Sequence, residues 1–342
     1  MPSKESGKRT KTILRASVAA ATLFYTQAVC ALDITPFNMT NQSPLVQIYG
    51  LPSPGNATLL SPGRKEFHAR LDHSSNYVNE SNPQERLLLD GETTRMTLGG
   101  RYGLAPNVEL GIDVPYIVQG GGFLDGFLIN YHDLFGFAQG GRDQAPRDRL
   151  LYRYEKNGVE KLRLDHSGNG FGDVSLSAGY QLYHDGKAFP RAVAVRTALK
   201  LPTGESGSLR GSGSTDFSLW VTASDGYGLP VGHGAVFAAL GFMAMTEGAV
   251  LSEQQRRGVG FGTVGAGWSP LSWIAFKVQL DAHTAFYKDS RFDALTSVAA
   301  QLQMGGTLAL SERTTLDIAV VEDVAVQTAP DVTFHFDLRT RF

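Results

Sequence analysis

The C-terminal segment 331–342 restricts the possible folds more than any other part of this chain, because its side chains alternate in polarity. One parity is apolar and ends on an aromatic residue: Val332, Phe334, Phe336, Leu338 and Phe342. The other parity is polar, with a single slip in the pattern at Thr340: Thr333, His335, Asp337, Arg339 and Arg341. A β-strand needs this period of two when one face meets an apolar phase and the other meets water. We therefore expect a final strand, either of a membrane barrel or of a soluble β-sandwich.

Segments of the same alternating kind recur from residue 65 onwards. Most have about ten or more residues, which is enough to cross a bilayer when a strand is tilted. Charged residues make up only 19% of the chain and Gly accounts for 39 of 342 residues, so tight turns matter more here than helix formers. We predict twelve strands, at 65–78, 92–103, 107–118, 171–184, 188–201, 214–225, 231–246, 258–268, 272–287, 295–310, 313–323 and 331–342.

The connections between these segments alternate strictly between short and long. The short ones lie at 103–107, 185–187, 225–230, 269–272 and 311–312. The long ones lie at 79–91, 119–170, 202–213, 247–257, 288–294 and 324–330. Tight periplasmic turns, longer outer loops and an even number of strands are typical of transmembrane barrels, whereas a sandwich has no reason to alternate in this way. The pattern predicts an all-β fold, a transmembrane antiparallel up-and-down β-barrel of about twelve strands, in the domain 65–342.

Residues 1–31 have the features of a secretory signal peptide. A basic region up to Arg15 precedes the apolar stretch 16–25, and Val29-Cys30-Ala31 is a small-x-small cleavage site. Cys30 is the only cysteine, so the mature chain would have neither disulfides nor a zinc–thiolate site. An exported chain without a later run of eighteen apolar residues is either soluble or a closed barrel, since every backbone polar group in lipid must be paired. We predict the bacterial outer membrane. The net charge of −2 gives no reason to expect nucleic acid as a partner.

Taking the polar parity as inward, the predicted lumen receives eight cationic and eight acidic side chains. The cations are Arg70, Arg95, Arg101, Arg196, Lys200, Lys277, Arg339 and Arg341, and the acids are Asp72, Glu109, Asp113, Asp173, Asp216, Asp281, Asp317 and Asp337. If the turn 103–107 sets the register, Arg101 lies opposite Glu109 and Arg95 lies diagonal to Asp113. These charges, with His283 and His335, are the pore-lining candidates. We expect them mainly to hold a narrow barrel together rather than to recognise a specific solute.

Two further segments are candidates for filling the barrel. Residues 32–64 are extended and rich in Pro and Gly, and suit a plug or a periplasmic tail. Residues 120–135, inside the loop 119–170, follow a helical period with the apolar stripe Leu124, Phe127, Leu128, Tyr131, Leu134 and Phe135. Asp125, His132 and Asp133 lie across from that stripe and join the constriction candidates. We favour a helix inside the pore over one on the outer leaflet. A metal site is disfavoured, because the adjacent His132 and Asp133 point in different directions on a helix.

No sequence motif indicates an enzyme or a cofactor. Nucleophile elbow, HExxH and P-loop motifs are missing from the sequence. A lipid hydrolase in a barrel would need a His beside a nucleophile at the membrane surface. We assign the strand histidines with clear parity, His68, His283 and His335, to the inner face. Three others lie in turns or loops and stay open for such a role: His132, His166 and His233.

Several motifs resemble those of Gram-negative outer-membrane channel families. They are a Gly-x-Gly-Asp strand start within 170–180, a Lys-x-Pro-Thr-Gly loop within 199–205, and the segment 211–216 that follows it. With the segments 89–92, 113–116, 124–126 and 131–133 included, the mature chain resembles one uncharacterised proteobacterial family, recorded as a domain of unknown function. The resemblance implies an outer-membrane location but neither a substrate nor catalytic residues.

The combined prediction is a passive channel or transporter for a small solute of unknown identity. Its expected partners are outer-membrane lipid and the barrel-assembly machinery, which would recognise the strand ending in Phe342. The alternatives are a lumenal or loop-based envelope enzyme and a structural or adhesive barrel.

Overall fold

The computed structural model describes residues 32–127, 129–130, 141–324 and 328–342. The predicted signal peptide, His132 and Asp133 lie outside the described residues. All statements below concern the unit that begins at Leu32.

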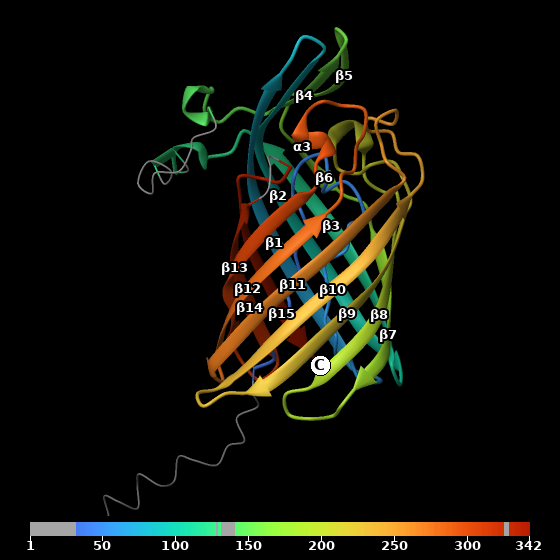
Figure 1. The fold of residues 1–342 in the computed structure, drawn as a ribbon, viewed down its shortest axis with the longest axis vertical. Coiled ribbons are helices and arrows are strands. Elements are labelled where there is room, and N and C mark those ends of the chain that lie inside the picture. Colours follow the sequence, from blue (N-terminus) through green and yellow to red (C-terminus); the bar gives the residue numbers. More distant parts are fainter. Residues whose placement is uncertain (1–31, 128, 131–140, 325–327) are drawn as a thin grey trace, which may run out of the picture. The chain divides into compact units, whose positions relative to one another are not determined.

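Twelve antiparallel strands form a closed barrel (Figure 1). Each pairs with its neighbours along the chain, and β15 pairs with β1 to close the wall. This confirms the predicted fold class. The barrel strands are β1 (Lys65–Ser81), β2 (Glu85–Ala105), β3 (Val108–Gly120), β7 (Ser175–His184), β8 (Arg191–Lys200), β9 (Asp216–Gly228), β10 (His233–Met245), β11 (Gly258–Leu271), β12 (Ile274–His283), β13 (Ala299–Ala309), β14 (Thr314–Asp323) and β15 (Val332–Arg341).

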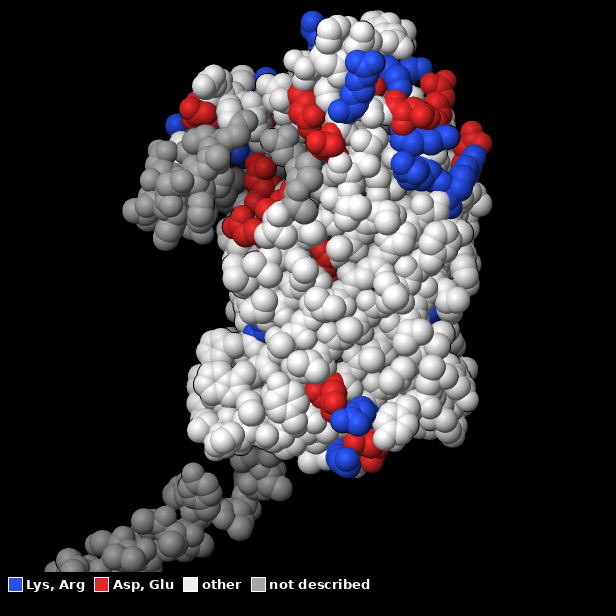
Figure 2. All heavy atoms as spheres, viewed as in Figure 1, with Lys and Arg blue, Asp and Glu red and all other residues white. Residues whose placement is uncertain are grey.

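Alternating polarity gives the wall its two faces. On β12, Phe276 and Val278 are exposed on the outside, whereas Lys277 and Gln279 are buried inside. Figure 2 shows the result on one face of the molecule, where Lys, Arg, Asp and Glu gather near the two ends and the middle is largely uncharged. An apolar band between charged rims is the arrangement that a bilayer requires of a barrel.

The rims differ in the length of their connections. Short turns join the strands at one rim, for example at 229–232, and we call this the turn rim. The opposite rim, the loop rim, has longer connections, with one exception. Residues 79–91, predicted as a loop, are mostly strand, because β1 and β2 continue as a hairpin in which Ser81 pairs with Arg86. Leu87 and Leu89 are buried there, and β4 (Leu151–Lys156) and β5 (Val159–Leu164) extend the same sheet.

The remaining elements are short and lie in the loops: η1 (Arg142–Gln144), β6 (Gly168–Phe171), η2 (Ser206–Ser208) and α3 (Asp293–Thr296). Residues 125–127 and 129–130 are also helical. Within the described ranges, no helix is both long and apolar enough to cross a membrane.

The described start of the predicted helix 120–135 lies outside the pore. Leu124 packs against Val332, and the Phe127 ring centroid is 6.4 Å from that of Phe334. Val332 and Phe334 have the outward parity of β15. The expectation of a helix inside the pore is therefore wrong for these residues. An apolar stripe packs equally well on the outside of a barrel, so the stripe alone could not distinguish the two positions.

Residues 32–64 run up and down inside the barrel (Figure 1). The first leg starts at the turn rim, where His233 Nε2 is 2.9 Å from the Leu32 carbonyl oxygen. It passes β12, where the Phe37 N–H donates to Gln279 Oε1 at 2.8 Å. Near the loop rim, the Tyr287 hydroxyl donates to the Leu45 carbonyl at 2.8 Å. The first leg therefore follows the wall from one rim towards the other.

The second leg returns along the opposite wall. The Gly50 N–H donates to Asp216 at 2.7 Å, the Trp220 indole donates to the Pro54 carbonyl at 2.8 Å, and the Gly63 N–H donates to the Gly103 carbonyl at 2.8 Å. Both ends of the segment therefore lie at the turn rim.

A hydrophobic cluster fills the barrel near the loop rim. Leu45, Ile48 and Tyr49 from the top of the segment pack with buried side chains of the wall and of the loops. The Tyr49 and Phe286 rings stack with centroids 4.9 Å apart. The polar part of the lumen consequently lies below this cluster, towards the turn rim.

Candidate functional site: the lumenal cavity

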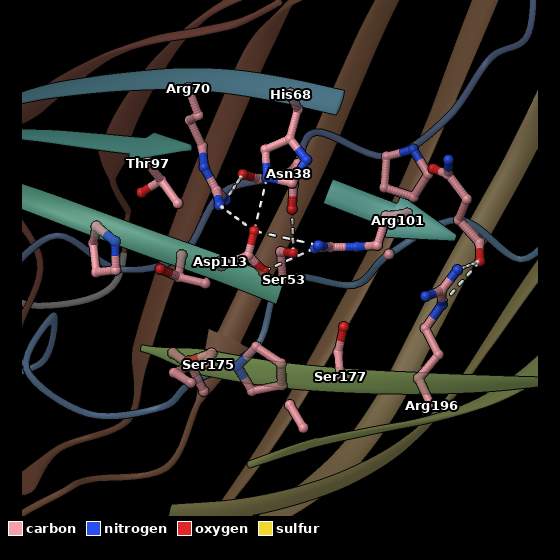
Figure 3. A pocket seen from close by; sticks show the side chains of 18 of the residues that line it. Asn38, Ser53, His68, Arg70, Thr97, Arg101, Asp113, Ser175, Ser177 and Arg196 are labelled. Carbon is pink, nitrogen blue, oxygen red and sulfur yellow. Dashed lines mark hydrogen bonds and ion pairs between the residues drawn. The ribbon is translucent and has the colours of Figure 1, made fainter. Parts of the chain in front are cut away.

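A polar cavity of about 130 Å³ lies between both legs of segment 32–64 and the wall, where most of its lining strands are β1, β2, β3, β7 and β8. Figure 3 shows its side chains, which come from both the wall and the segment. Arginines, carboxylates, Ser and Thr dominate the lining, in keeping with the inward parity of these strands.

Asp113 is the centre of an ionic cluster in the cavity wall. Its carboxylate lies 2.8 Å from Arg101 Nη2, 2.7 Å from His68 Nε2 and 4.0 Å from Arg70 Nη2. Gly99 allows this close approach, because a Cβ there would lie 2.3 Å from Asp113 Oδ1 and 2.4 Å from His68. Side chains from β1, β2 and β3 therefore meet over Gly99, where the Cβ of a larger residue would collide with them.

The predicted pairing of Arg101 with Glu109 is wrong. A register shift between Gly103 and Ala105 places Gly103 opposite Glu109, so that Arg101 stands opposite Gly111 and reaches diagonally to Asp113. Arg95 is not paired with Asp113 either, and stands opposite Ile117. A single irregularity near the turn thus changes the partners of both arginines for which an ion pair between these strands was expected.

Glu109 instead joins the wall to the segment. It lies 3.1 Å from Arg196 Nη1 on β8 and accepts a hydrogen bond of 2.9 Å from the Leu60 N–H. Arg196 also donates to the Asn56 carbonyl from Nε at 3.0 Å and from Nη2 at 2.6 Å. Both charged side chains are buried, so this group anchors the second leg near the cavity.

Lys200 anchors the same leg nearer to the loop rim. Its ammonium lies 2.7 Å from Asp173 and 3.1 Å from Asp216, and it donates to the Ile48 carbonyl at 3.3 Å. Lys200 therefore binds two carboxylates and one backbone carbonyl of the segment, and in this way links the segment to the wall.

A second ionic network holds the first leg. Lys277 and Arg339 lie 3.1 Å and 2.6 Å from Asp317, and Arg339 lies 3.7 Å from Asp337. Lys277 also donates to the Thr35 carbonyl at 3.0 Å. All four charged groups are buried, so the network links the first leg to β12, β14 and β15 inside the barrel.

Three other inward candidates form hydrogen bonds within the wall or to the segment. His335 Nδ1 lies 2.6 Å from Asp72, His283 Nε2 lies 2.9 Å from Asn41 Nδ2, and Asp281 accepts from Thr263 at 2.6 Å. Among the described residues, no three His, Cys, Asp or Glu side chains form a group that could hold a metal ion.

Asp125 is not part of the lumen. It forms an ion pair with Arg142, which also pairs with Asp331 and lies 5.5 Å over the ring of Tyr77. Burial alone would lower the pKa of Arg142, but the carboxylates of Asp331 and Asp125 raise it above its usual value. This group fastens the loop that follows β3 to the barrel.

The sequence-based assignment of histidines overlooked His73, which faces outward. Its Nδ1 lies 2.8 Å from Thr94 Oγ1 and its Nε2 lies 3.1 Å from Glu92 Oε2. Phe123 stacks on the ring at 5.3 Å, and Glu92 Oε1 accepts the N–H groups of Phe123 and Leu124. The group therefore anchors the loop beneath an aromatic ring. The strict alternation of β1 would have shown that His73 has the parity opposite to His68.

The fold and its ionic lumen define a barrel of the bacterial outer-membrane type. The chain belongs to the family described as "Protein of unknown function (DUF3187)", whose model matches residues 12–342. This match confirms the family resemblance seen in the motifs. No curated protein matches the chain.

The chain is also similar to solved structures. The chain is similar to the COG4313 outer membrane channel from Pseudomonas putida F1, with a TM-score of 0.55 and 13% identity over 85% of this chain and 99% of that chain. It is also similar to the NanC porin, with a TM-score of 0.43 and 9% identity over 81% of this chain and 98% of that chain. At 13% identity, the likeness to the first of these structures concerns the fold alone.

Proposed function

We propose that the protein resides in the bacterial outer membrane and passes a small solute through its lumen, along a path restricted by residues 32–64. The observation that carries this proposal is the polar cavity inside a closed wall whose outer face is apolar. A twelve-stranded barrel is too wide to be filled by the side chains of its wall alone. Here the separate segment fills part of the interior and leaves a polar space beside the wall, which suits passage of a hydrophilic solute.

The hydrophobic cluster near the loop rim limits this path. Leu45, Ile48 and Tyr49 belong to segment 32–64, and their partners Phe286 and Tyr287 follow β12 in a loop. Passage therefore requires these contacts to separate, and we expect brief openings rather than a steadily open pore.

A thiol introduced into the cavity tests whether current follows this path. Ser177 on β7 lines the cavity (Figure 3), and Ser252 is an exposed residue of the loop between β10 and β11. We expect purified Ser177→Cys protein to carry current in planar bilayers, to lose it on reaction with a charged methanethiosulfonate, and to regain it with reductant. Ser252→Cys protein should keep its current throughout.

Two results would contradict the proposal. Absence of current from the wild-type protein, once folding is verified by heat-modifiable gel migration, would remove the channel. Current that is unchanged after complete modification of Ser177→Cys would show that the path does not use this cavity.

A further inference from the structure

We propose that the lumenal cavity binds a small oxyanion between Arg70 and Arg95, so that the solute, or the group by which it is held, is negatively charged. This inference rests on the proposed function and adds the chemical class of the solute. It depends on which charged side chains of the cavity already form ion pairs.

Every carboxylate that lines the cavity lies close to a basic side chain. Four form ion pairs with Arg or Lys at distances between 2.7 and 3.1 Å: Glu66–Arg341, Glu109–Arg196, Asp113–Arg101 and Asp173–Lys200. The fifth, Asp72, lies 2.6 Å from Nδ1 of His335, which carries a charge only when it is protonated. Four of the five carboxylates are therefore neutralised without Arg70 or Arg95.

Arg70 and Arg95 are left with weak compensation. Arg70 comes no closer than 4.0 Å to Asp72 or Asp113, and Arg95 forms no ion pair with any residue that the structure describes. Each donates instead to a backbone carbonyl of segment 32–64: Arg70 to Asn38, and Arg95 to Gln47 at 2.8 Å. A carbonyl accepts a hydrogen bond but carries no full charge, so the two guanidiniums share at most the one carboxylate of Asp72, and an excess of positive charge remains beside the cavity.

The two arginines lie close together on the wall. Arg70 on β1 stands opposite Thr97 on β2, and the next inward pair joins Asp72 to Arg95. Both guanidiniums belong to the cavity lining. The paired strands therefore hold two guanidiniums beside one carboxylate, and this excess of positive charge repels a cation and favours an anion.

Two buried donors at the same place also need an acceptor. Within the described part of the chain, Arg70 Nε and Thr97 Oγ1 are buried and have no hydrogen-bond partner. Thr97 is only 2% exposed, and Figure 3 shows it beside Arg70 at the cavity. A carboxylate or phosphate oxygen placed here would accept from both groups while its charge compensates the guanidiniums. The small cavity limits the bound group to a small one.

Binding is measured on the purified full chain in detergent, without any need for transport. Isothermal titration would use acetate, benzoate and inorganic phosphate as probes, with tetramethylammonium chloride as the cationic control at matched ionic strength. We expect at least one oxyanion to bind and the cation to give no signal. Binding of only carboxylates or only phosphate would support the site and identify the class.

Variants locate the site. We expect Arg95→Gln and Arg70→Gln to weaken binding at least tenfold, Arg95→Lys to retain a measurable part of it, and Arg313→Gln, in an exposed turn, to leave it unchanged. Heat-modifiable migration verifies folding, and Arg95→Lys serves as the test if a Gln variant does not fold. Failure of all three oxyanions to bind, or wild-type affinity in both Gln variants, would overturn the inference.

Conductance separates this inference from the proposed function. Oxyanion binding without any current would support the anion site and refute the channel function. Current with a reversal potential that favours cations, together with no oxyanion binding, would keep the channel and remove the anion site.

Discussion

Replacement of Arg196 by Met tests whether buried ion pairs between wall and segment stabilise the barrel. Arg196 is 7% exposed and Glu109 is 5% exposed, and their charged atoms are 3.1 Å apart. Removing one partner of a buried pair costs ~3–5 kcal/mol, because the other charge stays buried. Glu109 would keep its hydrogen bond from the Leu60 N–H at 2.9 Å, so we expect the lower end of that range. Met preserves much of the side-chain volume, so the loss comes from the ion pair and from the two hydrogen bonds to the Asn56 carbonyl rather than from a cavity.

Urea unfolding in detergent micelles, followed by the shift between folded and unfolded gel bands, measures this change. The exposed Arg163→Met is the matched control, and we expect it to stay within ~0.5 kcal/mol of the wild type. The double variant Arg196→Met/Glu109→Gln also removes the unpaired charge of Glu109, so it should recover part of the lost free energy of unfolding. We expect a coupling energy of ~1–3 kcal/mol between the two residues. An Arg196→Met free energy of unfolding equal to that of the control would refute the electrostatic reasoning.

Two further substitutions test the close packing of the site and the apolar outer face. Gly99→Ala should destabilise the barrel by ~1–3 kcal/mol in the same urea assay, because its Cβ would meet Asp113 and His68. The neighbouring Gly100→Ala is the control and should be nearly neutral, because its Cβ meets nothing closer than 3.7 Å. Leu240→Arg, at an outward position that is 75% exposed, should cost ~2–4 kcal/mol in lipid vesicles if this face meets acyl chains. An equal free energy of unfolding for Leu240→Arg and wild type would contradict a bilayer around β10.

The period-two pattern and the alternation of short and long connections were together sufficient to predict the barrel. Parity alone placed Arg70, Asp113 and Lys277 on the inner face, because a strand in a closed wall has no other way to arrange polar side chains. Partner assignment failed where the register depends on one bulge, between Gly103 and Ala105. A bulge of this kind leaves no signal in polarity, so sequence could not show that Glu109 pairs with Arg196.

The path of residues 32–64 was also beyond the reach of sequence patterns. Many of its contacts use backbone groups, such as the Gly50 N–H and the Asn56 carbonyl, which all residue types except Pro supply in full. The outward His73 cluster is a different case, because simple alternation along β1 reveals it.

The up-and-down course of segment 32–64 has a consequence for assembly. Leu32 and Gly63 contact the same end of the cylinder, so the segment enters as a doubled-back loop and never passes through to the far opening. The segment can therefore insert without any chain end passing through the barrel. The strands can close the wall first, and the loop can enter afterwards. Withdrawal can follow the same route in reverse, with the ring of strands left intact.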